Sequence, residues 1–288
     1  MRAFPFLRSL GALIVYLSSA AVVGAAVIPP EGARPVQEEE WMAQGVPLLP
    51  HRANYFFPFA YNTNPHSTSN HRAQHKEAKF QLSFKILLLD KLFFRRANWY
   101  FGYTQLSMWQ VYDQSRSAPF RDTNYEPETF ISVATGEPLG WLTLKQVDLG
   151  LSHQSNGISR PDSRSWNRLY LRFLLDAESF SLTVKPWIRL PDAGRDDNSD
   201  ISRYLGYGEV TVSYMIRSHV VSFMFRNNLR VPRNRGAIQF DYSFPLTRNI
   251  TSLVQWFNGY GESLIDYNKP NNRFSIGLAL AYEAKPVR

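Results

Sequence analysis

Apolar and polar residues alternate one by one along most of the chain, as in a β-strand whose two faces meet different surroundings. In residues 77–86 the even positions are apolar and the odd positions are charged or polar. The same period returns in 180–189, 238–244 and 274–282. The pattern predicts about twelve strands of about 9 to 16 residues, near 54–62, 77–88, 98–113, 123–135, 142–157, 163–177, 180–190, 203–217, 219–230, 235–246, 249–261 and 272–283.

These segments predict an all-β fold, a twelve-stranded antiparallel transmembrane β-barrel. Their length suits strands that cross a bilayer at a tilt. A soluble sandwich would also alternate, but its dry core could not hold unpaired Lys, Arg and Glu in successive strands. Connections are short at 177–179 and 217–219 and long at 65–76 and 191–200, the loop asymmetry of outer-membrane barrels.

The inward charged rows of a small barrel should interlock as hydrogen-bonded networks that fill the lumen. We expect four acidic side chains to be lumen partners of arginines: Asp148, Glu209, Asp241 and Glu262.

The N-terminus carries a targeting pattern. Two arginines precede an apolar stretch, residues 10–26, which ends in small residues and favours a signal peptide over a membrane anchor. Its removal takes away two arginines and no acid, which lowers the net charge from +8 to +6. We therefore divide the chain into a signal peptide (1–26), a Pro-, Glu- and Gly-rich arm (27–52) that is mobile or loosely docked, and a barrel domain (53–288).

Composition narrows the function. The chain has no cysteine, which excludes disulfides and thiolate metal sites. Its positive charge is scattered without a long basic run, which speaks against nucleic-acid binding. With 20 Phe, 15 Tyr and 7 Trp, the chain is rich in the residues of strands and membrane interfaces. Four histidines in or beside loops, without metal-site spacing, are expected to be solvated: His51, His66, His71 and His75.

Two strands carry polar groups within apolar rows. His153 and Ser155 continue the outward row of residues 147–151, and Asn167 lies in the apolar row of the next strand. Serine becomes a nucleophile when a base takes its proton, and histidine, with an ordinary pKa of about 6.5, is that base at neutral pH. Asn167 could orient the imidazole, and a neutral amide costs less to desolvate than a carboxylate. The three residues therefore form a candidate nucleophilic site on the outer wall.

Four segments carry a family resemblance: HQSNGISRPDSRSWNRLY (153–170), TNYEPE (123–128), VKPW (184–187) and GYGESLIDYN (259–268). They are similar to outer membrane phospholipase A, of the phospholipase A1 family, and the similarity runs from about residue 54 to 282. The resemblance implies a twelve-stranded barrel in the bacterial outer membrane that hydrolyses phospholipid ester bonds. It further implies dependence on Ca²⁺ and an active homodimer whose two sites lie on the outer barrel wall.

Carried over by position, the resemblance makes Ser155 the nucleophile, His153 the general base and Asn167 its orienting partner. The backbone amide of Gly157 would help to hold the oxyanion.

The resemblance also implies a calcium site. Its ligands would be the carbonyl of Ile158, the hydroxyl of Ser163 and the carbonyl of Ser117 from the other subunit. Oxygen donors of this kind suit a hard cation. Gln105 is a lone glutamine in an outward apolar row, which predicts a pairing with its twin across the dimer interface; a place in the headgroup zone is the alternative.

Two features depart from the family. Position 158 is Ile where a family member has Arg, and the chain continues after Tyr282 with EAKPVR, whereas outer-membrane barrels usually finish on an aromatic residue. A different class of function also remains open at this point, a non-enzymatic porin or adhesin barrel in which the His-Ser-Asn set is a coincidence.

Overall fold

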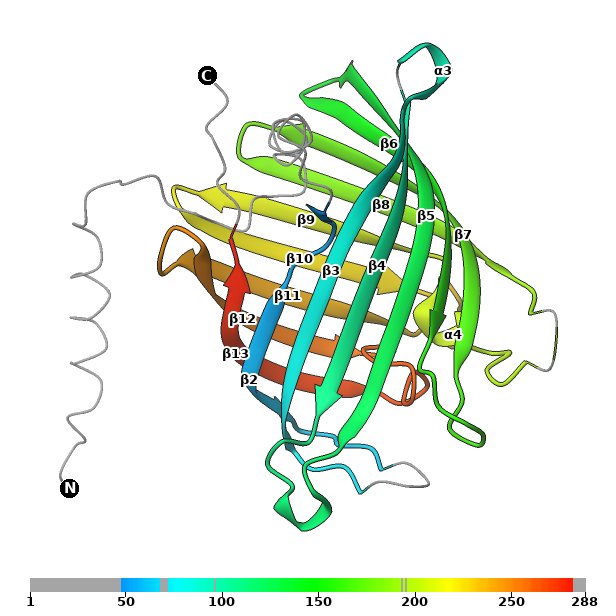
Figure 1. Cartoon of the computed structure of the whole chain (residues 1–288), viewed down its shortest axis with the longest axis vertical. Helices are drawn as coiled ribbons and strands as arrows, with labels where there is room; N and C mark the ends of the chain where they lie inside the picture. Colours follow the sequence, from blue (N-terminus) through cyan, green and yellow to red (C-terminus); the bar gives the residue numbers. More distant parts are fainter. Residues whose placement is uncertain (1–47, 68–71, 96, 193, 195, 282–288) are drawn as a thin grey trace.

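A closed antiparallel barrel forms the body of the protein (Figure 1). The computed structural model describes residues 48–67, 72–95, 97–192, 194 and 196–281. In this part of the chain each strand from β2 to β13 pairs with its sequence neighbours, and β2 pairs with β13 to close the sheet. The twelve wall strands are β2 (Tyr55–Asn62), β3 (Lys76–Lys91), β4 (Ala97–Trp109), β5 (Phe120–Leu139), β6 (Leu142–Ser155), β7 (Ser165–Ala177), β8 (Phe180–Leu190), β9 (Gly208–Ile216), β10 (His219–Asn227), β11 (Gly236–Pro245), β12 (Ile250–Gly259) and β13 (Asn271–Leu280).

The twelve-stranded all-β prediction is thus confirmed. The remaining elements within the described residues are short: β1 (Leu49–Pro50), α3 (Leu92–Arg95), η3 (Gln114–Arg116) and α4 (Ser202–Leu205). Within the described residues, no helix is long and apolar enough to cross a membrane.

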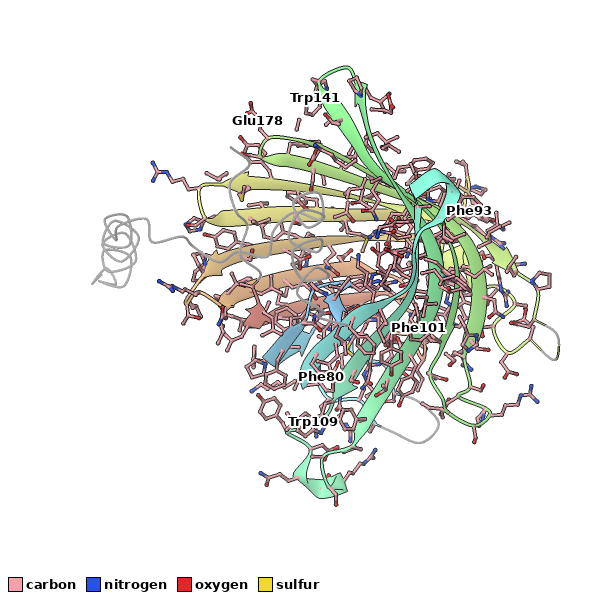
Figure 2. All side chains as sticks on the ribbon, turned by 45° about the horizontal axis from the view of Figure 1, so that its top comes forward. Phe80, Phe93, Phe101, Trp109, Trp141 and Glu178 are labelled. Atoms are coloured by element: carbon pink, nitrogen blue, oxygen red, sulfur yellow. The ribbon has the colours of Figure 1, made fainter. Side chains whose placement is uncertain are left out.

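The predicted alternation corresponds to the two faces of the wall. In β13, Phe274, Ile276 and Leu278 are 43–52% exposed, whereas Ser275 and Ala279 between and beyond them are 3% exposed. Figure 2 shows Phe80, Phe101 and Trp109 along β3 and β4, and Phe93, Trp141 and Glu178 at the turns of the opposite end. Apolar rows therefore face outward and small or polar rows face the lumen.

The two ends of the barrel differ. At one end, turns of two residues join β7 to β8 (178–179) and β9 to β10 (217–218). At the other end lie the long connections, including 110–119 between β4 and β5, 156–164 between β6 and β7, and 191–207 between β8 and β9. This confirms the predicted asymmetry, and it places the loops that flank the candidate site on one rim.

Buried ion pairs form interlocked networks in the lumen, as predicted, around a cavity of about 310 Å³. The carboxylate of Glu126 accepts hydrogen bonds from Arg52 Nη2 at 2.8 Å and from Arg168 Nη2 at 2.6 Å. Asp148 pairs with Arg172 at 2.7 Å, and Glu262 pairs with Arg273 at 2.8 Å.

Two of the four acidic side chains do not form the predicted ion pair with an arginine among the described residues. Asp241 was expected to face an arginine, but its oxygens accept from Gln239 and Gln255, both at 2.7 Å. No ion pair of Glu209 is found among the described residues; Arg52 and Arg226 act on it through charge alone. The strand register decides this, because it places Gln255 directly opposite Asp241.

An aromatic cluster packs inside the barrel behind β5 to β8. It includes Phe130, Trp166, Tyr170 and Trp187, each at most 4% exposed. Tyr170 crosses above Gly150 of β6, where a Cβ atom would lie 2.4 Å from its ring, and its hydroxyl donates to Glu128 at 2.6 Å. Close packing of this kind makes the wall that carries the site stiff from behind.

The N-terminal segment corrects two predictions. β1 pairs with β3, and Leu49 is 1% exposed within the lumen cluster, so residues 48–52 are not loosely attached. His51 is buried rather than solvated, because its ring stacks on Phe130 and its Nε2 lies 2.6 Å from Glu128. Of the other loop histidines for which solvation was predicted, His66 and His75 lie among the described residues and hydrogen-bond to backbone oxygens.

Several predictions lie outside the described residues. These are the signal peptide (1–26), most of the arm (27–47), His71 and the EAKPVR segment after Tyr282.

Residues 203–207 were predicted as the start of a strand, but α4 occupies this position and β9 begins at Gly208. The reason is burial, since Ile201 and Leu205 both point into the lumen cluster, where they are at most 4% exposed. A helical turn places residues four apart about 6 Å from each other along one face, whereas a strand would separate them by about 13 Å.

Candidate active site on the outer wall

His153 and Asn167 lie side by side on the outer wall. β6 and β7 pair so that His153 stands opposite Asn167 and Ser155 stands opposite Ser165. His153 Nδ1 and Asn167 Oδ1 are 2.8 Å apart. Because an amide oxygen only accepts, this bond places the imidazole proton on Nδ1 and leaves Nε2 as the basic nitrogen.

Ser155 shares this outward face. It lies two residues beyond His153, a Cα spacing of about 7 Å along a strand. Its hydroxyl makes no hydrogen bond within the part of the chain that the structure describes. On its other side the neighbour across the sheet is Tyr125 of β5, so Ser155 stands half-buried between Tyr125 and Ser165.

The inward side chains between these groups lock the two strands together. Trp166, fully buried, donates from Nε1 to Gln154 Oε1 at 2.8 Å. The guanidinium of Arg168 lies 4.3 Å from the ring centre of Trp166 and donates to Ser152 at 3.1 Å. The spacing of His153 and Asn167 is thus fixed by contacts on the far face of the sheet.

The β6–β7 loop is organised by Asn156, which is 3% exposed. Its Nδ2 donates to the carbonyl of Asp162 at 2.9 Å, and its Oδ1 accepts from the amide of Arg164 at 2.9 Å. Its backbone amide donates to the Arg164 carbonyl at 3.0 Å. One buried amide therefore closes the loop that holds Gly157, Ile158 and Ser163.

Gly157 has φ +64°, a conformation that favours glycine, and a Cβ atom there would lie 3.1 Å from the ring of Tyr125. The glycine therefore allows the chain to turn directly beside Ser155 and to hold its amide near the nucleophile.

The oxygens that the resemblance assigns to calcium are available. Within the described chain, neither the carbonyl of Ile158 nor the hydroxyl of Ser163 accepts or donates a hydrogen bond. Ser117, exposed in the β4–β5 loop, has left-handed backbone angles (φ 57°, ψ 37°), and its carbonyl is likewise unpaired within this part of the chain. These neutral oxygens fit a hard cation. No group of three His, Cys, Asp or Glu side chains occurs among the described residues, so a cation here would rely on carbonyl and hydroxyl ligands.

Gln105 belongs to a polar row on the outer wall of β4 and β5. Gln105 Nε2 donates to Ser107 Oγ at 3.2 Å, Tyr103 donates to Gln105 Oε1 at 3.3 Å, and the hydroxyls of Ser107 and Thr123 are 3.2 Å apart. The row is close to the nucleophile, because Gln105 pairs with Tyr125, which pairs with Ser155.

Comparison with known proteins now decides the family. Residues 33–280 match the family model described as Phospholipase A1. A phospholipase A1 of Klebsiella pneumoniae is 36% identical over 238 residues, covering 81% of this chain and 82% of that protein. A protein of Neisseria meningitidis serogroup B is 41% identical over 248 residues; the match covers 79% of this chain and 64% of that protein, so the chain spans slightly less than two thirds of it.

The chain belongs to the phospholipase A1 family. It is thus an outer-membrane β-barrel of the ester-hydrolase class that this name denotes. The expectation of a non-enzymatic porin or adhesin is set aside by the same match.

Solved structures agree with the phospholipase A1 assignment. Outer membrane phospholipase A from Escherichia coli, in an active-site mutant with an asparagine replaced by alanine, matches with a TM-score of 0.78 and 34% identity over 83% of this chain and 93% of that chain. The Salmonella typhi outer membrane phospholipase, a dimer with bound calcium, matches with a TM-score of 0.77 and 34% identity over the same shares.

Sequence reasoning missed two residues that organise this candidate site. Asn156 was read only as part of the motif, although the alternation did place it in the inward row, where a lone amide needs partners. Asp192 is not part of the alternation of apolar and polar residues, yet its Oδ1 accepts a hydrogen bond from Asn167 Nδ2 at 2.9 Å. It comes from the irregular segment after β8, which carries no periodic signal.

Proposed function

We propose that this phospholipase A1 chain hydrolyses the acyl ester bonds of phospholipids and lysophospholipids with Ser155 as nucleophile, His153 as general base and Asn167 as its orienting partner. One observation carries the proposal, the 2.8 Å contact of His153 Nδ1 with Asn167 Oδ1 on the outer wall, with Ser155 two residues away on the same face. The Escherichia coli relative whose active-site mutant replaces an asparagine supports the role of Asn167.

In the first half of the reaction, Ser155 Oγ attacks the ester carbonyl while His153 Nε2 takes its proton. The tetrahedral intermediate collapses as the alkoxide of the glycerol leaves and receives the proton from His153, which leaves an acyl group on Ser155. Water then attacks this ester with His153 again as base, and fatty acid is released. Asn167 holds the imidazole and stabilises the proton on Nδ1 in both halves.

The negative charge that develops on the carbonyl oxygen needs a donor. The amide of Gly157, two residues beyond Ser155 in a left-handed conformation that favours glycine, is the donor that we assign.

A calcium ion held by the Ile158 carbonyl, the Ser163 hydroxyl and Ser117 of the partner subunit would add positive field at the same oxygen. The unpaired state of these oxygens supports this site, as does the calcium bound by the Salmonella relative.

A homodimer follows from the same assignment, because the family resemblance places the Ser117 ligand on the partner subunit. The Salmonella relative is a dimer, which supports this arrangement. Each calcium site would be complete only when two barrels meet.

The decisive experiment measures fatty acid release from phospholipid micelles with excess Ca²⁺. Ser155→Ala and His153→Ala should each lower turnover by more than about 1,000-fold. Ser165→Ala is the matched control, because Ser165 stands opposite Ser155 on the same face and is equally half-buried. A folded Ser155→Ala barrel with wild-type turnover would overturn the assignment.

Asn167→Ala should be milder, with turnover lowered roughly 10- to 100-fold, because an orienting group costs less than the base that it holds. The same assay checks this ranking, and an Asn167→Ala loss as deep as that of His153→Ala would contradict it.

For the metal, Ser163→Ala should raise the Ca²⁺ concentration for half-maximal activity and leave residual activity at saturating Ca²⁺, because one ligand among several is lost. Ser159→Ala, an exposed serine of the same loop, is the control and should leave the calcium curve unchanged. Activity that is indifferent to EDTA would refute the calcium site.

A further inference from the structure

Asn167 is held from both sides of its amide group. Its Oδ1 contacts His153 Nδ1 at 2.8 Å, and its Nδ2 donates to Asp192 Oδ1 at 2.9 Å. Asp192 reaches this position because Asn167 pairs with Leu190, the last residue of β8, and Asp192 follows two residues later. A carboxylate therefore stands directly behind the residue that orients the imidazole.

The chemistry of an amide makes this contact consequential. The two ends of an asparagine side chain have nearly the same shape, but one only accepts and the other only donates hydrogen bonds. If the group rotated by half a turn, Nδ2 would face the imidazole, and His153 would have to present an unprotonated Nδ1. The imidazole would then carry its proton on Nε2. A protonated Nε2 cannot accept the proton of Ser155, so His153 could not act as the base.

An ionised carboxylate accepts hydrogen bonds but does not donate them, so Asp192 selects one of these two orientations. Only the amide end of Asn167 that carries hydrogens can face it favourably. The oxygen end is thereby directed at His153. A glutamine or asparagine in place of Asp192 would lack this selectivity, since it could serve either end.

Asp192 is itself fixed by Arg189, whose Nη2 lies 3.1 Å from Asp192 Oδ2 and 2.7 Å from Asp196 Oδ2. The side chains of Arg189 and Asp192 are 15% and 16% exposed, which removes most of the competing water. Charge-assisted hydrogen bonds in such surroundings are stronger than neutral ones. An unbroken series of hydrogen bonds thus runs from the guanidinium of Arg189 through Asp192 and Asn167 to the imidazole of His153.

We propose that Asp192 is a positioning residue of the catalytic site, which acts through Asn167 by fixing the orientation of its amide and hence the tautomer of His153. The proposal rests on the proposed function, because it presumes that His153 is the base. Asp192 itself touches neither substrate nor the nucleophile. Its removal should therefore lower kcat and leave the KM for phospholipid unchanged.

The first arm of the test is Asp192→Asn, an isosteric change, assayed for fatty acid release with saturating Ca²⁺. It should lower kcat about tenfold without a change in KM. Asp176→Asn makes the same charge change on β7, the strand of Asn167, but near the far rim, where Asp176 faces Lys145. This control should keep wild-type kcat, and a wild-type kcat for Asp192→Asn would overturn the proposal.

The second arm places Asp192→Asn in an Asn167→Asp background. A carboxylate at position 167 has two equivalent oxygens, so nothing remains to be oriented, and the carboxylate of Asp192 now repels it. Asp192→Asn should then raise kcat instead of lowering it. An equal loss in both backgrounds would mean a general structural effect of Asp192 and would overturn the positioning role while the triad stands.

Arg189→Gln supplies a second variant that leaves Asp192 and Asn167 in place. It should lower kcat in the same direction as Asp192→Asn and have no such effect in the Asn167→Asp background. Asn167→Ala distinguishes failure of the triad from failure of the positioning role. If Asn167→Ala keeps wild-type kcat, the proposed triad is refuted and the role of Asp192 is refuted with it. If Asn167→Ala lowers kcat and Arg189→Gln and Asp192→Asn do not, only the present inference is refuted.

Discussion

Gly157 joins β6 to the loop that carries the proposed calcium ligands, and its surroundings leave little freedom. It combines a positive φ of 64° with a ring carbon of Tyr125 3.1 Å from the place of a Cβ atom. The next loop residues are fixed through Asn156, which bonds to Asp162 and Arg164. The position of one amide is thus determined by its neighbours on both sides.

We therefore expect Gly157→Ala to lower turnover roughly tenfold or more, because the added methyl would displace the amide that we assign to the oxyanion. The left-handed conformation itself costs an L-residue about 1–2 kcal/mol. Gly136→Ala is the matched control, since Gly136 has φ +79° in the β5–β6 hairpin with no atom within 4 Å of a Cβ. Fatty acid release from both variants measures the difference; equal, small losses would show that the Gly157 amide takes no part.

At the scale of elements, the segment 260–270 between β12 and β13 folds into the mouth of the barrel. Asp266 pairs with Arg121 at 2.9 Å, and the amide of Leu264 donates to Asn124 at 3.0 Å. Glu262 lies between Lys79, at 2.9 Å, and Arg273. A loop between two strands thereby ties β13 to β3 and β5 across the lumen.

This loop should make the barrel sensitive to acid. Burial by itself would raise the pKa of Glu262, but Arg273 and Lys79 hold that pKa at about 2, below its ordinary value of 4.5. A carboxyl group with a lowered pKa in the folded state stabilises the fold above pH 4.5, and this contribution is lost as the pH falls toward 2. The stability difference between wild type and Glu262→Gln should therefore be constant above pH 4.5 and shrink below it.

Heat-modifiability on gels, measured from pH 7 downward, checks this difference. A stability difference that grows as the pH falls would contradict the assignment of Glu262 as the ionised partner of Arg273.

The strands could be predicted wherever successive side chains face lipid and lumen in turn. The segments 180–190 and 77–88 coincide with or lie within β8 and β3, because lipid on one side and lumen on the other impose a period of two. His51 was mispredicted because its burial depends on the closed lumen, where Phe130 and Glu128 meet it from a distant strand. Asp192 was missed for the same reason: its contact with Asn167 joins residues of different elements and has no period.

The site residues divide in the same way. His153, Ser155 and Asn167 stood out because each interrupts an apolar outward row, and the register brings His153 and Asn167 together as that pattern implied. The oxygens of Ile158 and Ser117 that we propose as calcium ligands are backbone atoms, which no side-chain pattern can reveal. Only the family resemblance indicated them.

For the whole molecule, the side of the barrel with the site differs from the opposite side. β5 and β6 have 20 and 14 residues, whereas β9 and β10 have 9 each. The tall side also carries the polar row with Gln105, two strands from Ser155 and so about 10 Å from it. One surface therefore holds both the nucleophile and the groups that we assign to dimer formation.

Gln105→Leu should weaken the dimer, because the hydrogen bond that we propose between Gln105 and its twin across the interface would be lost. It should lower activity more at low enzyme density than at high density. The single barrel should still fold, since the partners of Gln105 among the described residues are two side chains of its own wall, Tyr103 and Ser107. His219→Phe is the control: it removes an outward hydrogen bond, to Tyr242 at 2.8 Å, on β10 and β11 across the barrel.

Cross-linking and fatty acid release, followed together through detergent dilution, measure both quantities. If activity per barrel stays constant while the cross-linked dimer disappears, each barrel has a self-sufficient site and the shared calcium site is wrong.

The outward position of His153 and Ser155 has a consequence for how this protein meets its substrate. A group on the outer wall of a barrel encounters only molecules that diffuse in the plane around it, so collisions are counted in two dimensions. The rate should follow the mole fraction of phospholipid in the surface and not its molarity in the surrounding water. An inert detergent that spreads the same amount of lipid over more surface should therefore slow the enzyme, even though nothing in the bulk solution has changed.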